Sequence, residues 1–151
     1  MTEFKIPVPL KLEHEELHAE LDRATRSGGK TAEAAKIVAN VLHPHFVKEE
    51  EFALPPLGLL TRLGNGQLDL PRMKDVLAMT DRLKADLPQM IAEHKTIVSA
   101  LENLVRAAEE ENKPEYARFS EKLMLHAQTE EEVLYPAVIM IGEFVKLQLG
   151  K

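Results

Sequence analysis

The chain has 151 residues, a length that fits one domain with a core of its own. Its hydrophobic fraction of 44% and charged fraction of 29% are ordinary for a globular protein, and a net charge of −6 without a basic block argues against nucleic acid or anionic membrane partners. Cysteine is absent, which excludes disulfides, iron–sulfur clusters and thiolate catalysis. Any metal must therefore be bound by nitrogen and oxygen ligands.

The N-terminal segment does not have the pattern of a targeting signal. MTEFKIPVPLKLEHEE carries acidic residues and prolines where a signal peptide needs a basic start and an apolar run. No stretch approaches the roughly 18 apolar residues of a membrane span. We therefore expect a cytoplasmic protein.

The first part of the chain predicts an arm followed by two helices. Residues 1–9 contain two prolines, and we expect them to form an extended arm. A first helix is expected over about 10–25. The glycine pair at 28–29 should end it, because glycine readily adopts the left-handed conformation of a helix C-cap. A second helix is expected over about 31–52, with a kink at Pro44.

The second part predicts a connection and two further long helices. Residues 56–70 contain three glycines and are expected to connect the halves, and a short helix is expected over about 73–83. A third main helix is expected from near Pro88 to about residue 112, since proline is tolerated in a first turn. The fourth is expected over about 115–149, with a second kink at its internal proline, residue 136.

No long period-two alternation indicates a strand. Four long amphipathic helices predict an all-α, up-down-up-down four-helix bundle with a short extra helix between the second and third main helices. We expect one domain over residues 1–151 and regard the excursion at 56–83 as a candidate lid or interface.

A sequence repeat connects the two halves. The motif H-x3-E-E-E-x3-P begins at His45 in the second expected helix and at His126 in the fourth. Each copy is preceded by a Glu-His pair one helix earlier, with His14 31 residues before His45 and His94 32 residues before His126. The chain therefore resembles two copies of one helix pair, each contributing a His and then a His-x3-Glu.

The repeated side chains interrupt apolar helix faces. Residues four apart share one face of a helix, so each motif His points the same way as its Glu, and the stripe of Met90, Ile97 and Leu101 includes His94. An ionised carboxylate in an apolar core costs several kcal/mol unless it is paired or bound to metal. No Lys or Arg occupies a matching core position, so a metal cation is the expected partner. Four His and two Glu suffice for two metal ions, and the Glu carboxylates can bridge them: His14, His45, Glu49, His94, His126 and Glu130.

Some nearby residues remain open alternatives. His18 lies one turn after His14 and also borders the apolar face, so it is a second candidate for that ligand position. Tyr135 follows the second motif and is expected either to pack or to line the pocket. The additional glutamates of both motifs are expected to form a solvated face, although one of them could orient a ligand His.

This pattern resembles the hemerythrin-like (HHE cation-binding) family, whose H…HxxxE…H…HxxxE motif is matched by the six residues above over nearly the whole chain. The resemblance implies a non-haem di-iron centre. It implies that His14 and His45 bind one iron and that His94 and His126 bind the other. It further implies that Glu49 and Glu130 bridge the irons together with an oxo or hydroxo group, with positions open to dioxygen, peroxide or nitric oxide.

Two departures from the oxygen carriers of the wider family bear on function. Those carriers have a further His four residues after the His of the third helix, where this chain has Val98, and they have an Asp five residues after the last His, where this chain has Glu130 at four. One carrier ligand is thus missing, which disfavours reversible oxygen carriage.

We therefore expect a di-iron protein that binds O2, NO or peroxide in sensing or in oxidative, nitrosative or iron stress handling. The alternatives are a di-iron oxidase or peroxidase with true turnover, or a metal-responsive interaction module. The expected cofactor is two Fe ions, with Mn or Zn as possible substitutes. The expected partner is a small diatomic ligand or peroxide, and the sequence does not specify an oligomeric state.

Overall fold

The structure is a computed structural model that describes residues 5–150. Within this range the chain forms helices and connecting turns and no strand, which confirms the all-α class. Residues 1–4 of the expected arm lie outside the described range, and the first helix already begins at Val8, so the arm is shorter than expected. None of the described helices combines the length and apolar character that crossing a membrane requires.

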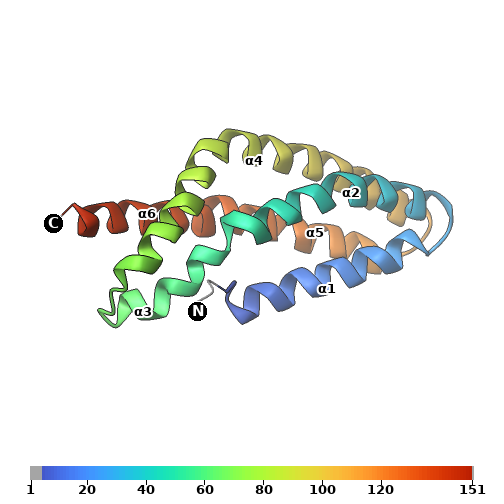
Figure 1. The fold of residues 1–151 in the computed structure, drawn as a ribbon. Coiled ribbons are helices and arrows are strands. Elements are labelled where there is room, and N and C mark those ends of the chain that lie inside the picture. The colour runs from blue at the N-terminus through green and yellow to red at the C-terminus, as the bar shows by residue number, and fades with distance from the viewer. Residues whose placement is uncertain (1–4, 151) are drawn as a thin grey trace.

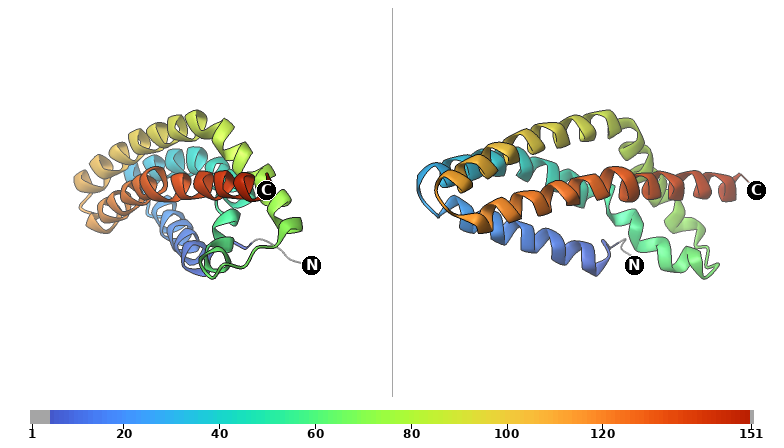
Figure 2. Two further views of the ribbon diagram at one scale, coloured as in Figure 1. Left: turned by 90° about the vertical axis from the view of Figure 1, so that its left-hand side faces the viewer. Right: turned by 180° about the vertical axis from the view of Figure 1, so that it is seen from behind.

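Four long helices form the bundle. Helix α1 packs against α2 and α5, and α4 packs against the same two helices, so the four close into a ring (Figures 1 and 2). Short turns join α1 to α2 and α4 to α5, which makes these neighbours antiparallel, as expected. The bounds are Val8–Thr25 for α1, Gly29–Lys48 for α2, Leu70–Glu110 for α4 and Pro114–Thr129 for α5.

The connection between the second and third main helices differs from the expectation. The expected short helix at 73–83 is wrong, because these residues belong to α4, which begins at Leu70 and continues through Pro88. Figure 1 shows α4 bending in its N-terminal half, as a proline inside a helix favours. The short extra helix is instead α3, Leu60–Gly64, preceded by a 3-10 turn, η2, at Pro55–Leu59.

Both copies of the repeated motif contain a widened helical turn. The π-turn η1 covers Glu49–Ala53 and the π-turn η3 covers Glu130–Leu134, and each is followed within two residues by the proline of the motif. In each, the first Glu accepts a backbone hydrogen bond from the residue five positions later. A proline lacks the N–H for the ordinary bond and clashes with the carbonyl four residues earlier, and a wider turn relieves that clash. The expected kink at Pro136 is therefore a π-turn, after which α6, Tyr135–Leu149, continues the helix.

Two apolar clusters fill the bundle on either side of one polar layer. The first contains Leu17, Leu42 and Leu101, and the second contains Phe52, Met90 and Val138. Along the chain, the six repeated His and Glu residues lie where members of one cluster give way to members of the other. The fold thus places all the repeated side chains in a single layer.

Candidate metal centre

The six predicted side chains meet in the centre of the bundle. Each is at most 6% exposed, although four are histidines and two are glutamates. Helices α1 and α4 each supply one His, while α2 with η1 and α5 with η3 each supply a His and the Glu that follows it. The structure thus brings together every predicted ligand, and their binding of metal stays a prediction.

These residues form two overlapping groups of possible ligand atoms. One group consists of His14, His126 and both glutamates, and the other of His45, His94 and the same two glutamates. Within each group the ligand atoms lie within 4.8 Å of one another. The expected pairing of His14 with His45 and of His94 with His126 is therefore wrong, because the His14 ring turns toward His126, with a centroid distance of 5.2 Å, and the His45 ring turns toward His94, at 4.5 Å.

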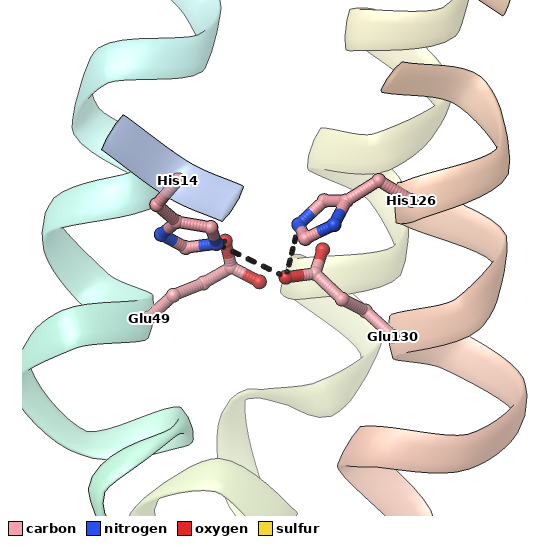
Figure 3. Close-up of side chains that lie close together, drawn as sticks. All are labelled: His14, Glu49, His126 and Glu130. Atoms are coloured by element: carbon pink, nitrogen blue, oxygen red, sulfur yellow. Dashed lines mark ion pairs between the residues drawn. The ribbon is translucent and has the colours of Figure 1, made fainter. Parts of the chain in front are cut away.

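Each carboxylate turns one oxygen to each group. Glu49 Oε1 lies 3.6 Å from His14 Nε2, and Glu49 Oε2 lies 3.6 Å from His45 Nε2. Glu130 Oε2 lies 3.1 Å from His126 Nε2, and its Oε1 lies 3.2 Å from His94 Nε2. Figure 3 shows the first group, with its four side chains pointing toward one another. Both glutamates therefore have the arrangement of bridging ligands.

The chemistry of these donors fits a bound cation. Within the described part of the chain, His14 Nε2, His126 Nε2, Glu49 Oε1 and Glu130 Oε2 are buried without a hydrogen-bond partner, and all four converge on the first group. In the second group, His45 Nε2 and His94 Nε2 face each other at 2.8 Å. Leaving such buried polar atoms unpaired is costly, and a metal ion accepts all of these lone pairs at once.

Electrostatics also favours a cation. Burial and the neighbouring Glu130 carboxylate raise the pKa of Glu49 well above its ordinary value. Burial opposes ionisation of Glu130 as well, but the close approach of Glu49 and of the surrounding histidines holds its pKa well below the usual range. Without metal, the pair thus resists carrying two negative charges, whereas a cation between the carboxylates stabilises both charges.

Carboxylates face the outer nitrogen of each His. Glu93 Oε1 lies 2.9 Å from His45 Nδ1, and Glu13 contacts His126 Nδ1. An ionised carboxylate can only accept a hydrogen bond, so Nδ1 of His45 and of His126 carries the proton. Nε2 of each ring then presents its lone pair to the centre. At longer range, Glu131 Oε1 lies 3.7 Å from His94 Nδ1, and Glu50 Oε1 lies 3.9 Å from His14 Nδ1.

Tyr135 makes the two groups chemically different. Its hydroxyl donates to Glu49 Oε2 at 2.6 Å and lies 3.2 Å from His94 Nε2 and 3.3 Å from His45 Nε2. Burial and the nearby carboxylates raise its pKa far above the ordinary value, which keeps the phenol neutral. The residue at the equivalent position of the first motif is Leu54, so only the His45 and His94 group has a phenol beside it.

His18 does not join either group. It is half-buried, and its ring lies edge-on to Phe46, with a centroid distance of 4.9 Å, and to His43, with a centroid distance of 6.1 Å. The structure thus favours His14 over His18 as the member from α1.

Glu13 and Glu93, the partners of His126 and His45, were not among the site residues predicted from the sequence. A signal for both was present, because each stands immediately before the first His of its half, in Glu13-His14 and Glu93-His94. Adjacent helix residues point in different directions, so these glutamates cannot face the same centre as their neighbours. They reach instead the histidines of the other half, His126 and His45.

The fold and the site define an all-α bundle with a buried His and carboxylate centre for metal ions. The hemerythrin HHE cation binding domain matches residues 9–138, and the chain belongs to this family. No curated protein and no solved structure gave a significant match.

Proposed function

We propose that this protein holds two iron ions in the centre of its bundle and binds O2, NO or peroxide there, in sensing or in the handling of oxidative, nitrosative or iron stress. The observation that carries the proposal is the sharing of both Glu49 and Glu130 by two ligand groups. Family membership supports a cation, and a ligand set of imidazole and carboxylate without thiolate suits iron, with Mn or Zn as possible substitutes.

The ligand count supports the binding of an additional small molecule. Each group offers two imidazole nitrogens and two shared carboxylates, which leaves open positions, as in the His and carboxylate sites of non-haem iron oxygenases. Val98, where the oxygen carriers of the wider family have a further His, adds no donor. When bound, iron supplies redox chemistry and these open positions, while the chain orients the donors and excludes bulk water.

Turnover as an oxidase or peroxidase is a second candidate, and one observation favours it. The neutral Tyr135 hydroxyl, whose proton is donated to Glu49 Oε2 at 2.6 Å, lies 3.2 Å from His94 Nε2, so an O–H group stands beside one of the two positions. A proton donor within hydrogen-bond reach of the reacting group is what general acid catalysis of peroxide cleavage requires. Steady-state turnover of peroxide faster than that of free iron supports this candidate, and a rate equal to that of free iron rejects it.

Anaerobic reconstitution with Fe2+ tests the main proposal. Iron analysis after desalting should give two ions per chain, and exposure to O2, peroxide or NO should change the optical spectrum. The matched control is the double variant Glu49→Ala with Glu130→Ala, which removes both shared carboxylates and should retain almost no iron. Wild-type protein without stoichiometric iron, or with a spectrum that none of the three molecules alters, contradicts the proposal.

A further inference from the structure

Several grooves on the described part of the bundle reach predicted ligands, and they differ in size and charge. Two small ones, of about 190 and 260 Å³, reach His126 and His45 and carry one carboxylate each, Glu13 and Glu93. Of the two large ones, only one reaches a predicted ligand. A groove of about 620 Å³ lies between α4 and α5, and its buried lining residues are His94 and Ala127. A groove of similar size, about 600 Å³, lies between α1 and α2, but none of the six predicted ligands lines it. The two large grooves occupy equivalent places in the repeated halves of the chain. A difference in side chains at equivalent positions must therefore explain why only one of them reaches a predicted ligand.

One pair of equivalent positions with different side chains explains why, of the two large grooves, only the α4/α5 groove reaches a predicted ligand. Phe46 follows His45, and the equivalent residue after His126 is Ala127. The Phe46 ring stacks on His14, with a centroid distance of 4.1 Å and an interplanar angle of 6°, and it separates His14 from His18, which lines the α1/α2 groove. On the other side, the small side chain of Ala127 leaves the groove open as far as His94.

The two grooves also differ in charge. The α4/α5 groove is lined by Glu102, Glu131 and Glu132 against one cationic side chain, Lys95. The α1/α2 groove has one carboxylate, Asp22, which is paired with Arg26 at 3.1 Å, and one lysine. Clefts lined by charge of one sign raise the local concentration of the opposite ion and its association rate.

A buried imidazole faces this acidic groove. His94 is 3% exposed, and its Nδ1 has no hydrogen-bond partner in the described part of the chain. The nearest carboxylate oxygen, Glu131 Oε1, lies 3.7 Å away, beyond hydrogen-bond distance. The groove therefore leads from exposed carboxylates at the surface to an incompletely satisfied imidazole at the centre.

We propose that the α4/α5 groove is the route by which divalent metal ions, Fe2+ above all, reach the centre, and that the His45 and His94 position is the one they reach first. This inference rests on the proposed function and adds the path of loading. Glu102 and Glu132 attract the ion, Ala127 leaves it room to pass, and the opposite face stays closed by Phe46.

Stopped-flow uptake of Co2+ by metal-free protein tests the route, because Co2+ is not oxidised during mixing and absorbs visibly once nitrogen and oxygen ligands bind it. The variant Ala127→Phe copies the closed side and should slow uptake at least about tenfold, within the range over which steering and access change association rates. The final amount of bound Co2+ should be unchanged. Circular dichroism checks that the larger ring leaves the helices intact.

A second variant leaves the core untouched. Glu102→Gln combined with Glu132→Gln alters only exposed side chains and should slow uptake several-fold at low salt, with the difference shrinking at high salt. Its matched control is Asp22→Asn in the α1/α2 groove, which should load at the wild-type rate.

The outcomes separate the route from the function. If wild-type protein binds two Co2+ ions and both the Ala127→Phe and the double Gln variants load at the wild-type rate, the route is wrong and the proposed centre stands. Equal slowing by Asp22→Asn also rejects the route. If wild-type protein itself fails to bind two ions at saturation, the proposed function fails with it.

Discussion

Glu93 and His45 come from different halves of the sequence repeat, yet their side chains meet, with 2.9 Å between Glu93 Oε1 and His45 Nδ1. Glu13 contacts His126 in the equivalent way. Each half of the chain thus orients a His of the other half, which ties the geometry of the centre to the association of the two helix pairs. Glu93 is itself held by Lys48, whose Nζ donates to Glu93 Oε2 at 2.7 Å.

Replacing Glu93 should weaken metal binding without removing a ligand. Glu93→Gln keeps the size of the side chain but loses the charge that fixes the proton on His45 Nδ1, and losses of such supporting groups typically cost about 10-fold to 100-fold in metal affinity. Competition with a chelator of known affinity measures the change. Glu109→Gln, an exposed change on the same helix, is the control, and equal affinities for the two variants would contradict the role of Glu93.

His14 and His18 should behave differently although they lie one turn apart on α1. His14→Ala removes one of the two imidazoles of its group, so we expect one tightly bound iron per chain in place of two. His18→Ala changes a residue outside both groups and should retain two. Iron analysis after anaerobic loading and desalting distinguishes the variants, and loss of iron only in His18→Ala would reverse the assignment.

Tyr135→Phe should destabilise metal-free protein more than loaded protein. The hydroxyl donates to the buried Glu49 Oε2 at 2.6 Å, and leaving a buried acceptor unpaired costs about 1–3 kcal/mol. A bound cation satisfies the same oxygen, so the loss should be smaller once metal is present. Urea unfolding with and without metal measures both effects, and Tyr116→Phe is the matched control on α5. Equal losses with and without metal would show that the hydroxyl does not support Glu49.

The carboxylate of Glu111 should make the free energy of unfolding depend on pH, and this dependence does not involve the metal centre. Its carboxylate accepts hydrogen bonds from the Thr31 hydroxyl and from the backbone N–H groups of Thr31 and Lys30 at the start of α2, and these bonds lower its pKa from 4.5 to about 2. A carboxylate whose pKa is depressed by folding stabilises the protein above its unfolded pKa, and this stability is lost as pH falls through the folded pKa.

The consequence is measurable in metal-free protein. Glu111→Gln should be less stable than wild type near neutral pH, and the gap should close between about pH 5 and pH 2, as the wild-type carboxylate becomes protonated. Urea midpoints at several pH values give the comparison, with Glu109→Gln as the control. A gap that stays constant over this window would show that the charge of Glu111 makes no contribution.

The members of the centre could be predicted from the sequence because helix geometry alone carries that information. His45 and Glu49 are four residues apart, so they must share a face whatever the tertiary structure, and the repeat at His126 and Glu130 shows the same relation. The interruption of apolar stripes by these residues then predicts burial.

The pairing of the histidines could not be predicted in this way. Each helix of the ring has two neighbours, and the pairing depends on which of the two its His faces in the polar layer. Periodicity within one helix contains no such information. The length of α4 was missed because Pro88 fits the first turn of a helix as well as a bend inside one. The π-turns were missed because a single widened turn barely disturbs a periodic pattern, although the prolines at 55 and 136 indicated some irregularity.

The central claim is that two metal positions share both Glu49 and Glu130, and magnetic coupling tests it most directly. Protein loaded anaerobically with two Fe2+ per chain and then oxidised should give a Mössbauer spectrum in an applied field in which both ferric ions belong to one coupled pair, since the two carboxylates connect the positions. Chains that retain only one iron, or two irons with the spectrum of isolated high-spin ions, would contradict the account.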